Sequence, residues 1–166
     1  MRLSKLKFLL VVAASLICGS ALADLPIALI DESSLPYNLS PSNYDNSPSN
    51  YDNSISNYDN SPSNYDNSES NYDNSASNYD NGRSGDRRLI YKDGGSLKFA
   101  GYYVAAKNGT TNFFSPQGKR MFYNPKKGRG IYGGKDGSFC GVLAKVDGKL
   151  SLALTERGAK ILLLSE

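Results

Sequence analysis

Basic side chains gather in one stretch of the sequence and give it the chemistry of an anion site. Lys119 and Arg120 precede a glycine-rich loop, and Lys126, Lys127 and Arg129 lie within it. Glycine lets backbone amides approach an anion, and lysine and arginine attract one. Nearby aromatic residues give this stretch the composition of a single-strand nucleic-acid platform, but the export signal described below argues against intracellular nucleic acid. The simpler interpretation is a solvated basic loop, and the more specific hypothesis is a site for a polyanion.

A second set of candidate contact residues recurs every seven positions. Residues 40–81 consist of six copies of Ser-x-Ser-Asn-Tyr-Asp-Asn, in which only the second position varies. Six identical weak sites on one string can bind a repetitive surface by avidity. The candidate contacts are the tyrosines of the six copies: Tyr44, Tyr51, Tyr58, Tyr65, Tyr72 and Tyr79. A plain tether and self-association of stacked repeats are the alternatives.

Catalytic chemistry has little support in this sequence. The chain contains no His, which removes His-based acid–base catalysis, Ser–His and Cys–His pairs and His-ligated metal sites. The acidic residues after position 82 are scattered over expected turns, and no serine stands in a nucleophile motif. The Asp/Asn repeat lacks the dense carboxylates and the turn glycine of calcium loops. We predict no catalytic residue, no metal ligand and no cofactor, and hence a protein that is not an enzyme.

The first 23 residues have the pattern of a secretory signal peptide. Three basic residues, Arg2, Lys5 and Lys7, precede an apolar run, residues 8–17, in which Ser15 is the only polar residue. Ala21 and Ala23 form a small-residue site, so we predict cleavage after Ala23 and export to the periplasm or the medium. The run is shorter than the roughly 20 residues of a membrane-spanning helix, and no later segment qualifies. The alternatives are an uncleaved anchor and a lipid-modified Cys18. Cleavage leaves a single cysteine, Cys140, which we expect to be a small buried residue on a strand.

Charge divides the mature chain into two unlike halves. Residues 24–82 contain ten acidic groups and no Lys or Arg, whereas residues 83–166 contain 16 basic and six acidic groups. The halves therefore carry opposite net charges of equal size, which indicates separate physical roles. The acidic half could lie against the basic half of the same molecule. Such an association would be loose and sensitive to salt, because exposed ion pairs are individually weak.

The repeat segment has the composition of a disordered tether. One Tyr in seven gives no paired apolar seam for a coiled coil, and three of the six copies carry Pro. Seven is an odd number, so successive tyrosines of a continuous strand would face opposite sides. We predict an extended, fluctuating chain with local turns at Asn and Asp. An ordered solenoid is the alternative, but it needs a buried face, and Tyr alone supplies little of one.

The basic half, residues 82–166, is predicted to be a small folded all-β domain. Asn-Gly and Asp-Gly turns separate short apolar runs, which is the strongest short-range signal for hairpins. The predicted fold class is therefore a mostly disordered acidic repeat segment followed by a small all-β domain, an antiparallel meander, a barrel or a sandwich. The expected strands span residues 88–91, 97–106, 110–115, 120–123, 131–132, 138–145, 150–155 and 160–164. The N-terminal segment, residues 24–39, can add an edge strand, which would make the repeat a closed loop.

The last strands and the core complete the expected domain. Residues 150–164 could begin a helix, but Gly158 in the middle costs a helix about 1 kcal/mol relative to Ala, so we predict a hairpin there. The expected core consists of the apolar residues of the strands: Leu89, Leu97, Phe99, Tyr103, Phe113, Phe122, Ile131, Phe139, Val142, Leu143, Leu152, Leu154, Ile161 and Leu163.

Together these features predict an exported, non-catalytic interaction protein in which a flexible tandem repeat is joined to a small β binding domain. Its expected partner is an unidentified protein or a surface polyanion. The first alternative is a secreted inhibitor or polyanion-binding module that acts through the basic β domain. The second is a self-assembling repeat protein.

Overall fold

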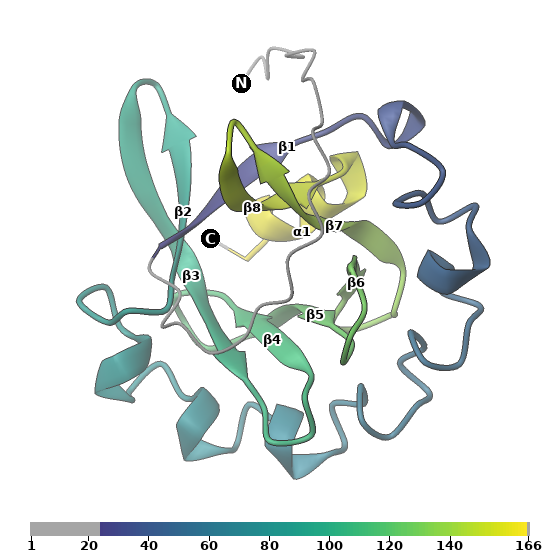
Figure 1. The fold of residues 1–166 in the computed structure, drawn as a ribbon. Coiled ribbons are helices and arrows are strands. Elements are labelled where there is room, and N and C mark those ends of the chain that lie inside the picture. Colours follow the sequence, from purple (N-terminus) through teal and green to yellow (C-terminus); the bar gives the residue numbers. More distant parts are fainter. Residues whose placement is uncertain (1–23, 166) are drawn as a thin grey trace.

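The computed structural model describes residues 24–165, which form a closed eight-stranded β-barrel with the repeats wrapped around it (Figure 1). The predicted signal peptide, residues 1–23, lies outside the described residues. Seven strands follow the repeats: β2 (Arg88–Asp93), β3 (Ser96–Ala105), β4 (Thr111–Phe114), β5 (Arg120–Asn124), β6 (Gly130–Gly133), β7 (Phe139–Val146) and β8 (Lys149–Leu154). Each pairs antiparallel with the next. The all-β prediction is confirmed, and the architecture is a barrel.

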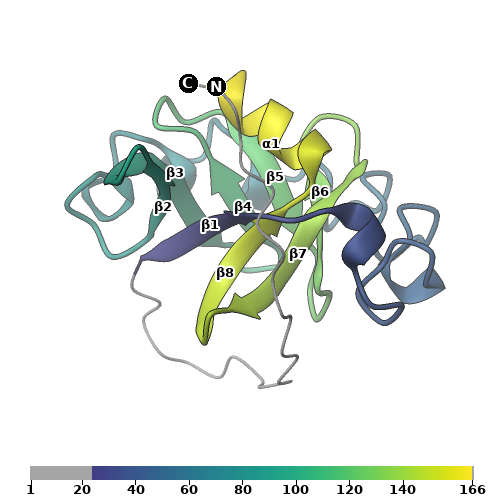
Figure 2. The same ribbon diagram turned by 90° about the horizontal axis from the view of Figure 1, so that it is seen from above.

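The barrel is closed by β1 (Leu25–Leu29), which precedes the repeats in the chain. β1 lies parallel to both of its neighbours: Leu25 pairs with Leu89 of β2, and Ile27 pairs with Leu152 of β8. Figure 2 shows β1 between these two strands. The expected N-terminal strand is therefore present, but it closes the sheet instead of forming an edge. Because β1 precedes the repeats and β2 follows them, the repeats are a loop anchored in the barrel at both ends.

Alternate side chains of the strands fill the barrel interior, as the two-residue period of a strand requires. Phe113, Phe122 and Ile131 are fully buried there, and Cys140 of β7 lies in the same cluster, as expected. Three expected core residues are not in the core. Phe99 of β3 is only half-buried, and the guanidinium of Arg83 lies 5.5 Å from the centre of its ring. Leu97, beside the β2–β3 turn, is 68% exposed, and Leu163, at the last turn of the chain's helix, is 44% exposed.

The repeats form an ordered belt, so the predicted disorder of residues 40–81 is not confirmed. The belt, residues 36–81, is a succession of tight turns around the outer face of β3 to β7 (Figure 1). Its 3₁₀ turns are η2 (Tyr44–Asn46), η3 (Tyr65–Asn67), η4 (Tyr72–Asn74) and η5 (Tyr79–Asn81), and a further one, η1 (Glu32–Ser34), precedes it. Order is reached because the buried face is built from asparagine, and not from tyrosine.

A second buried layer lies between the barrel and the belt. Tyr123 and Tyr132 project outward from β5 and β6, stack on each other at 5.6 Å between ring centroids, and are fully buried. Leu39 of the belt packs against this cluster and is 1% exposed. On β3 and β4, Tyr102 stacks on Phe114. The outward face of these strands therefore carries buried aromatic rings, and the belt shields them from water.

The chain ends in a helix where a last hairpin strand was expected. α1 (Glu156–Leu163) begins at the N-cap Thr155 and packs against β7 and β8, with Leu162 in the barrel core. Gly158 is what permits this approach, since a Cβ there would lie 2.4 Å from the carbonyl oxygen of Cys140. The prediction of a strand at residues 160–164 is wrong because close packing outweighs the helix penalty of glycine. Within residues 24–165, no helix has the length and apolar character needed to cross a membrane.

Candidate functional site

Each copy of the repeat folds on itself through two side-chain turns. The first serine accepts a hydrogen bond from the backbone N–H two residues later, as Ser40 does from Ser42 at 3.1 Å. The first asparagine does the same and caps the following turn, as Asn43 does for Asp45 at 3.0 Å. Both turns recur in all six copies. The composition that argued for local turns thus forms them in register.

Consecutive copies are joined by a ladder of buried asparagines, the last residue of each copy. Asn60 is typical: its Nδ2 donates to the carbonyl oxygen of Asp52 at 2.8 Å and to that of Ser54 at 3.1 Å. The ladder residues are 0–5% exposed. They are Asn46, Asn53, Asn60, Asn67, Asn74 and Asn81. One amide therefore satisfies two carbonyls, one from the preceding copy and one from its own copy, which a Tyr-based solenoid could not do.

Barrel side chains dock the belt roughly one copy at a time. The backbone carbonyls of four ladder residues accept hydrogen bonds at 2.7–2.8 Å: Tyr132 Oη to Asn46, Tyr123 Oη to Asn53, Arg120 Nη2 to Asn60 and Tyr102 Oη to Asn74. In the fourth copy, Asn112 Nδ2 donates to the side chain of Asn67 at 2.9 Å. Burial raises the pKa of Tyr102 to about 12, helped by the charge of Glu69, so the hydroxyl stays a donor at neutral pH.

Arg120, placed by the sequence in the predicted anion site, is instead part of this docking surface. It is 8% exposed, its Nε donates to Asn112 Oδ1 at 2.7 Å, and its guanidinium lies 4.8 Å from the centre of the Tyr123 ring. Burial lowers its pKa to about 10. Because the belt covers it, Arg120 is not available to an external anion, and the predicted site loses this member.

The other predicted anion-binding residues remain on the surface. Lys119 lies in the β4–β5 turn, and Lys126, Lys127 and Arg129 lie in the β5–β6 loop, all four exposed. Lys127 adopts a left-handed backbone conformation, φ 62°, within this loop. The structure therefore keeps the three loop cations together and separates them from Arg120.

The variable position of the repeat contacts the barrel in three of the copies. Ile55 packs against Gly137, where an added Cβ would lie 3.1 Å from it. Glu69 accepts a hydrogen bond from the backbone N–H of Arg120 at 2.8 Å. The side chain at position 76 is alanine, and it lies beside Gly118. The three copies without proline at this position thus each carry a residue that matches the barrel surface beside it.

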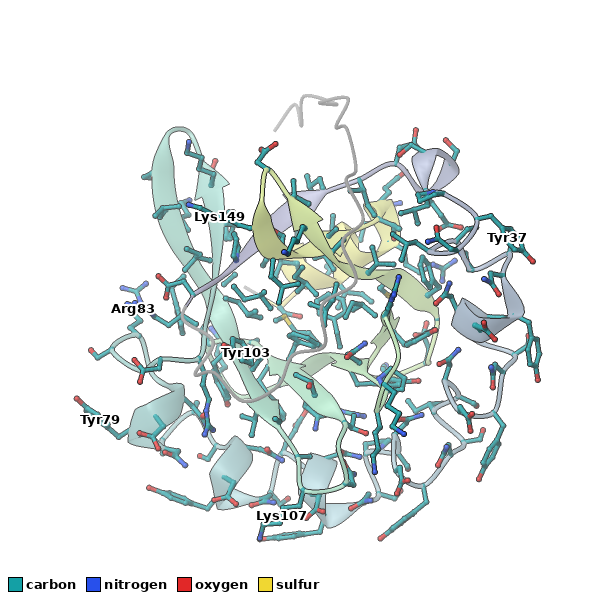
Figure 3. The ribbon with its side chains drawn as sticks, in the orientation of Figure 1. Tyr37, Tyr79, Arg83, Tyr103, Lys107 and Lys149 are labelled. Atoms are coloured by element: carbon teal, nitrogen blue, oxygen red, sulfur yellow. The ribbon has the colours of Figure 1, made fainter. Side chains whose placement is uncertain are left out.

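The tyrosines of the repeats form an exposed row on the outside of the belt. They project outward because the ladder asparagine two positions later faces the barrel. The row, which we call the tyrosine row, has a seventh member, Tyr37, seven residues before Tyr44; its members are 62–80% exposed. Figure 3 shows Tyr37 and Tyr79 pointing away from the barrel at the two ends of the row, in contrast to Tyr103 inside it. Sequence reasoning missed Tyr37, although its spacing was the available signal.

The first turn of the belt is a degenerate copy that starts the ladder. Leu39 lies seven residues before Asn46 and takes the buried position of an asparagine, but it packs into the apolar layer. The next asparagine reaches back to this copy, since Asn46 Nδ2 donates to the carbonyl of Asn38 at 2.9 Å. The ladder therefore begins on an apolar cap.

Comparison of the chain with protein-family profiles, with curated protein sequences and with solved structures gave no match. Function is therefore inferred from the geometry.

Proposed function

We propose that this protein is an exported, non-catalytic binding protein that holds a repetitive ligand along the tyrosine row. The observation that carries the proposal is the contrast within each copy. The side chains of the first serine and of the two asparagines make turn or ladder contacts, whereas the tyrosine side chain is 62–80% exposed. Large exposed aromatic residues at regular intervals are typical of interaction surfaces.

A row of equivalent residues suits a ligand that repeats along its length. Each tyrosine offers a small flat contact, and linked contacts raise the overall affinity steeply when their spacing matches that of the ligand. The belt holds the row in a fixed conformation, so less conformational entropy is lost on binding than with a flexible string. This replaces the expected flexible tether with a rigid binding face.

Binding to immobilised polymers by purified variants tests the proposal. A panel of linear glycans, poly-lysine, heparin and DNA presents repetitive ligands of different chemistry. We expect at least one polymer to be retained, and substitution of three tyrosines by serine (Tyr44, Tyr58, Tyr72) to weaken binding at least tenfold. The matched control replaces exposed serines of the same copies by alanine (Ser42, Ser56, Ser70), and it should bind like the unmodified protein. If the tyrosine substitutions leave the retention of every polymer unchanged, the proposal is contradicted.

A second candidate function rests on the β5–β6 loop. Lys126, Lys127 and Arg129 are exposed together and can attract a polyanion. Heparin retention should then fall on alanine substitution of these three residues and stay unchanged when the tyrosines are substituted. Heparin retention that survives the triple alanine substitution removes this candidate.

A further inference from the structure

A polar cleft lies where the last three copies of the belt meet the end of β3. Its volume is about 260 Å³. The belt contributes three aspartates from the same position of successive copies, Asp66, Asp73 and Asp80, and the barrel contributes Arg87 and Lys107. Figure 3 shows Lys107 below the barrel, on the side where the belt passes. The cleft is thus adjacent in sequence to three members of the tyrosine row, each directly before one of the aspartates.

The charged groups of the cleft are available to a ligand. Ion pairs among residues 24–165 involve other side chains, so none of the three carboxylates or two cations of the cleft belongs to a salt bridge. The backbone of each copy is held independently of these side chains, since the turn at Asp73 is formed by its N–H and Asn71 Oδ1 at 3.0 Å. The carboxylates therefore have no part in the hydrogen bonds that maintain the belt.

The cleft contains both negative and positive side chains, and this restricts the kind of ligand that it can bind. Three carboxylates oppose a polyanion, and two cations oppose a polycation. Within the described residues, the aspartates do not converge on a group that could hold a metal ion. Neutral hydroxyl groups fit both kinds of lining, because one hydroxyl can donate to a carboxylate and accept from a guanidinium or an ammonium.

The tyrosine row offers a second kind of contact to such a ligand, the stacking of rings. A pyranose ring has a polar rim of hydroxyls and flatter apolar faces, and such faces stack on exposed aromatic rings. A linear polysaccharide presents these units at regular intervals, as the row presents its tyrosines. We infer that the repetitive ligand is an uncharged linear polysaccharide, with its hydroxyls in the cleft and neighbouring units on Tyr65, Tyr72 and Tyr79. This inference rests on the proposed function and names its ligand class.

Binding of neutral oligosaccharides of two to eight units, measured by biolayer interferometry, tests the inference. We expect affinity to rise with length and to fall at least tenfold in the double variant Asp73→Asn, Asp80→Asn. The matched control is Asp45→Asn, Asp52→Asn, which removes the same charges from the same repeat position outside the cleft. It should stay within twofold of the unmodified protein. Thermal melting of both variants shows whether they fold alike.

Three results would overturn the inference. They are no retention of any neutral oligosaccharide, an equal loss in both double variants, or retention of poly-lysine or heparin alone. The last result leaves the proposed function standing if the retention depends on the tyrosines. If no polymer responds to tyrosine substitution, the proposed function fails as well, so the two failures are distinguishable.

Discussion

Asn67→Ala tests the asparagine ladder at a fully buried position. The Asn67 side chain donates to the carbonyls of Asp59 at 2.7 Å and Ser61 at 3.0 Å, and it accepts from Asn112 Nδ2 at 2.9 Å. Truncation removes these three bonds and a longer one of 3.4 Å from Asn108 Nδ2. The two carbonyls keep other donors, Thr110 for Asp59 and the Asn64 N–H for Ser61, whereas the buried Nδ2 of Asn112 loses its acceptor. At about 1 kcal/mol net for each of the three shorter bonds, the loss is about 3 kcal/mol, and the unsatisfied Nδ2 of Asn112 adds to it.

The control for this experiment lies two residues away. Tyr65 is 63% exposed, so Tyr65→Ala should change the free energy of unfolding by no more than about 0.5 kcal/mol. Urea denaturation followed by circular dichroism measures both variants, and a loss of 3 kcal/mol corresponds to a drop in melting temperature of about 10 °C. A third variant, Asn67→Asp, keeps the shape but places a carboxylate against two carbonyls, and it should be no more stable than the alanine variant. A cost below about 1 kcal/mol for Asn67→Ala, or an equal cost for Tyr65→Ala, would refute the ladder as the support of the belt.

Three further predictions concern the docked belt and the barrel. The belt is held by hydrogen bonds and apolar contacts, and its charged hydrogen bonds, those of Arg120 and Glu69, have uncharged partners. Within the described residues, the ion pair between the acidic and basic halves is Asp24–Arg88, which lies outside the belt, so raising NaCl tenfold should shift the melting temperature by no more than about 2 °C. The folded-state pKa of Tyr102, about 12 against 10.0, keeps its stabilising contribution intact below pH 10 and loses it as the pH rises to 12; near-ultraviolet circular dichroism should report undocking in that window and not below it. Cys140 is buried, with its pKa raised to about 11 by that burial, so a thiol reagent should label it only after denaturant is added, and rapid native labelling would contradict its placement.

The hairpins of the barrel could be predicted because their signals are local. Gly109, Gly137 and Gly148 adopt the positive φ angles that the Asn-Gly and Asp-Gly pairs anticipated. The seven strands from residue 88 to residue 154 fall close to their expected positions for the same reason. Closure by β1 was less visible, since parallel pairing with Leu89 and Leu152 joins segments that are far apart in the sequence.

The belt could not be predicted from its own composition because half of its support belongs to the barrel. The repeat was predicted to be disordered because it has no apolar face to bury, but its buried side chains are asparagines. The carbonyls that these residues present are satisfied by Tyr102, Tyr123 and Tyr132, which the pattern of the β strands alone does not assign to the outside. The prediction that Arg120 belongs to an exposed anion site was wrong for the same reason. Its position beside a basic loop indicates exposure, and only the contact with the belt shows that it is buried.

Because the six copies are nearly identical, the belt could pair with the barrel in more than one alignment, and the residues that differ between copies select one of them. Every ladder asparagine offers the same carbonyl, so the barrel's donors could engage the belt one copy too early or too late with most hydrogen bonds retained. The correct alignment is distinguished by what differs: Leu39 fits the apolar layer, Ile55 fits the space beside Gly137, and Glu69 reaches the backbone of Arg120. These few residues fix the alignment of the otherwise periodic belt on the barrel. If the belt gained or lost one copy, the residues on one side of the change would no longer face their contacts on the barrel. The number of copies is therefore coupled to the circumference of the barrel.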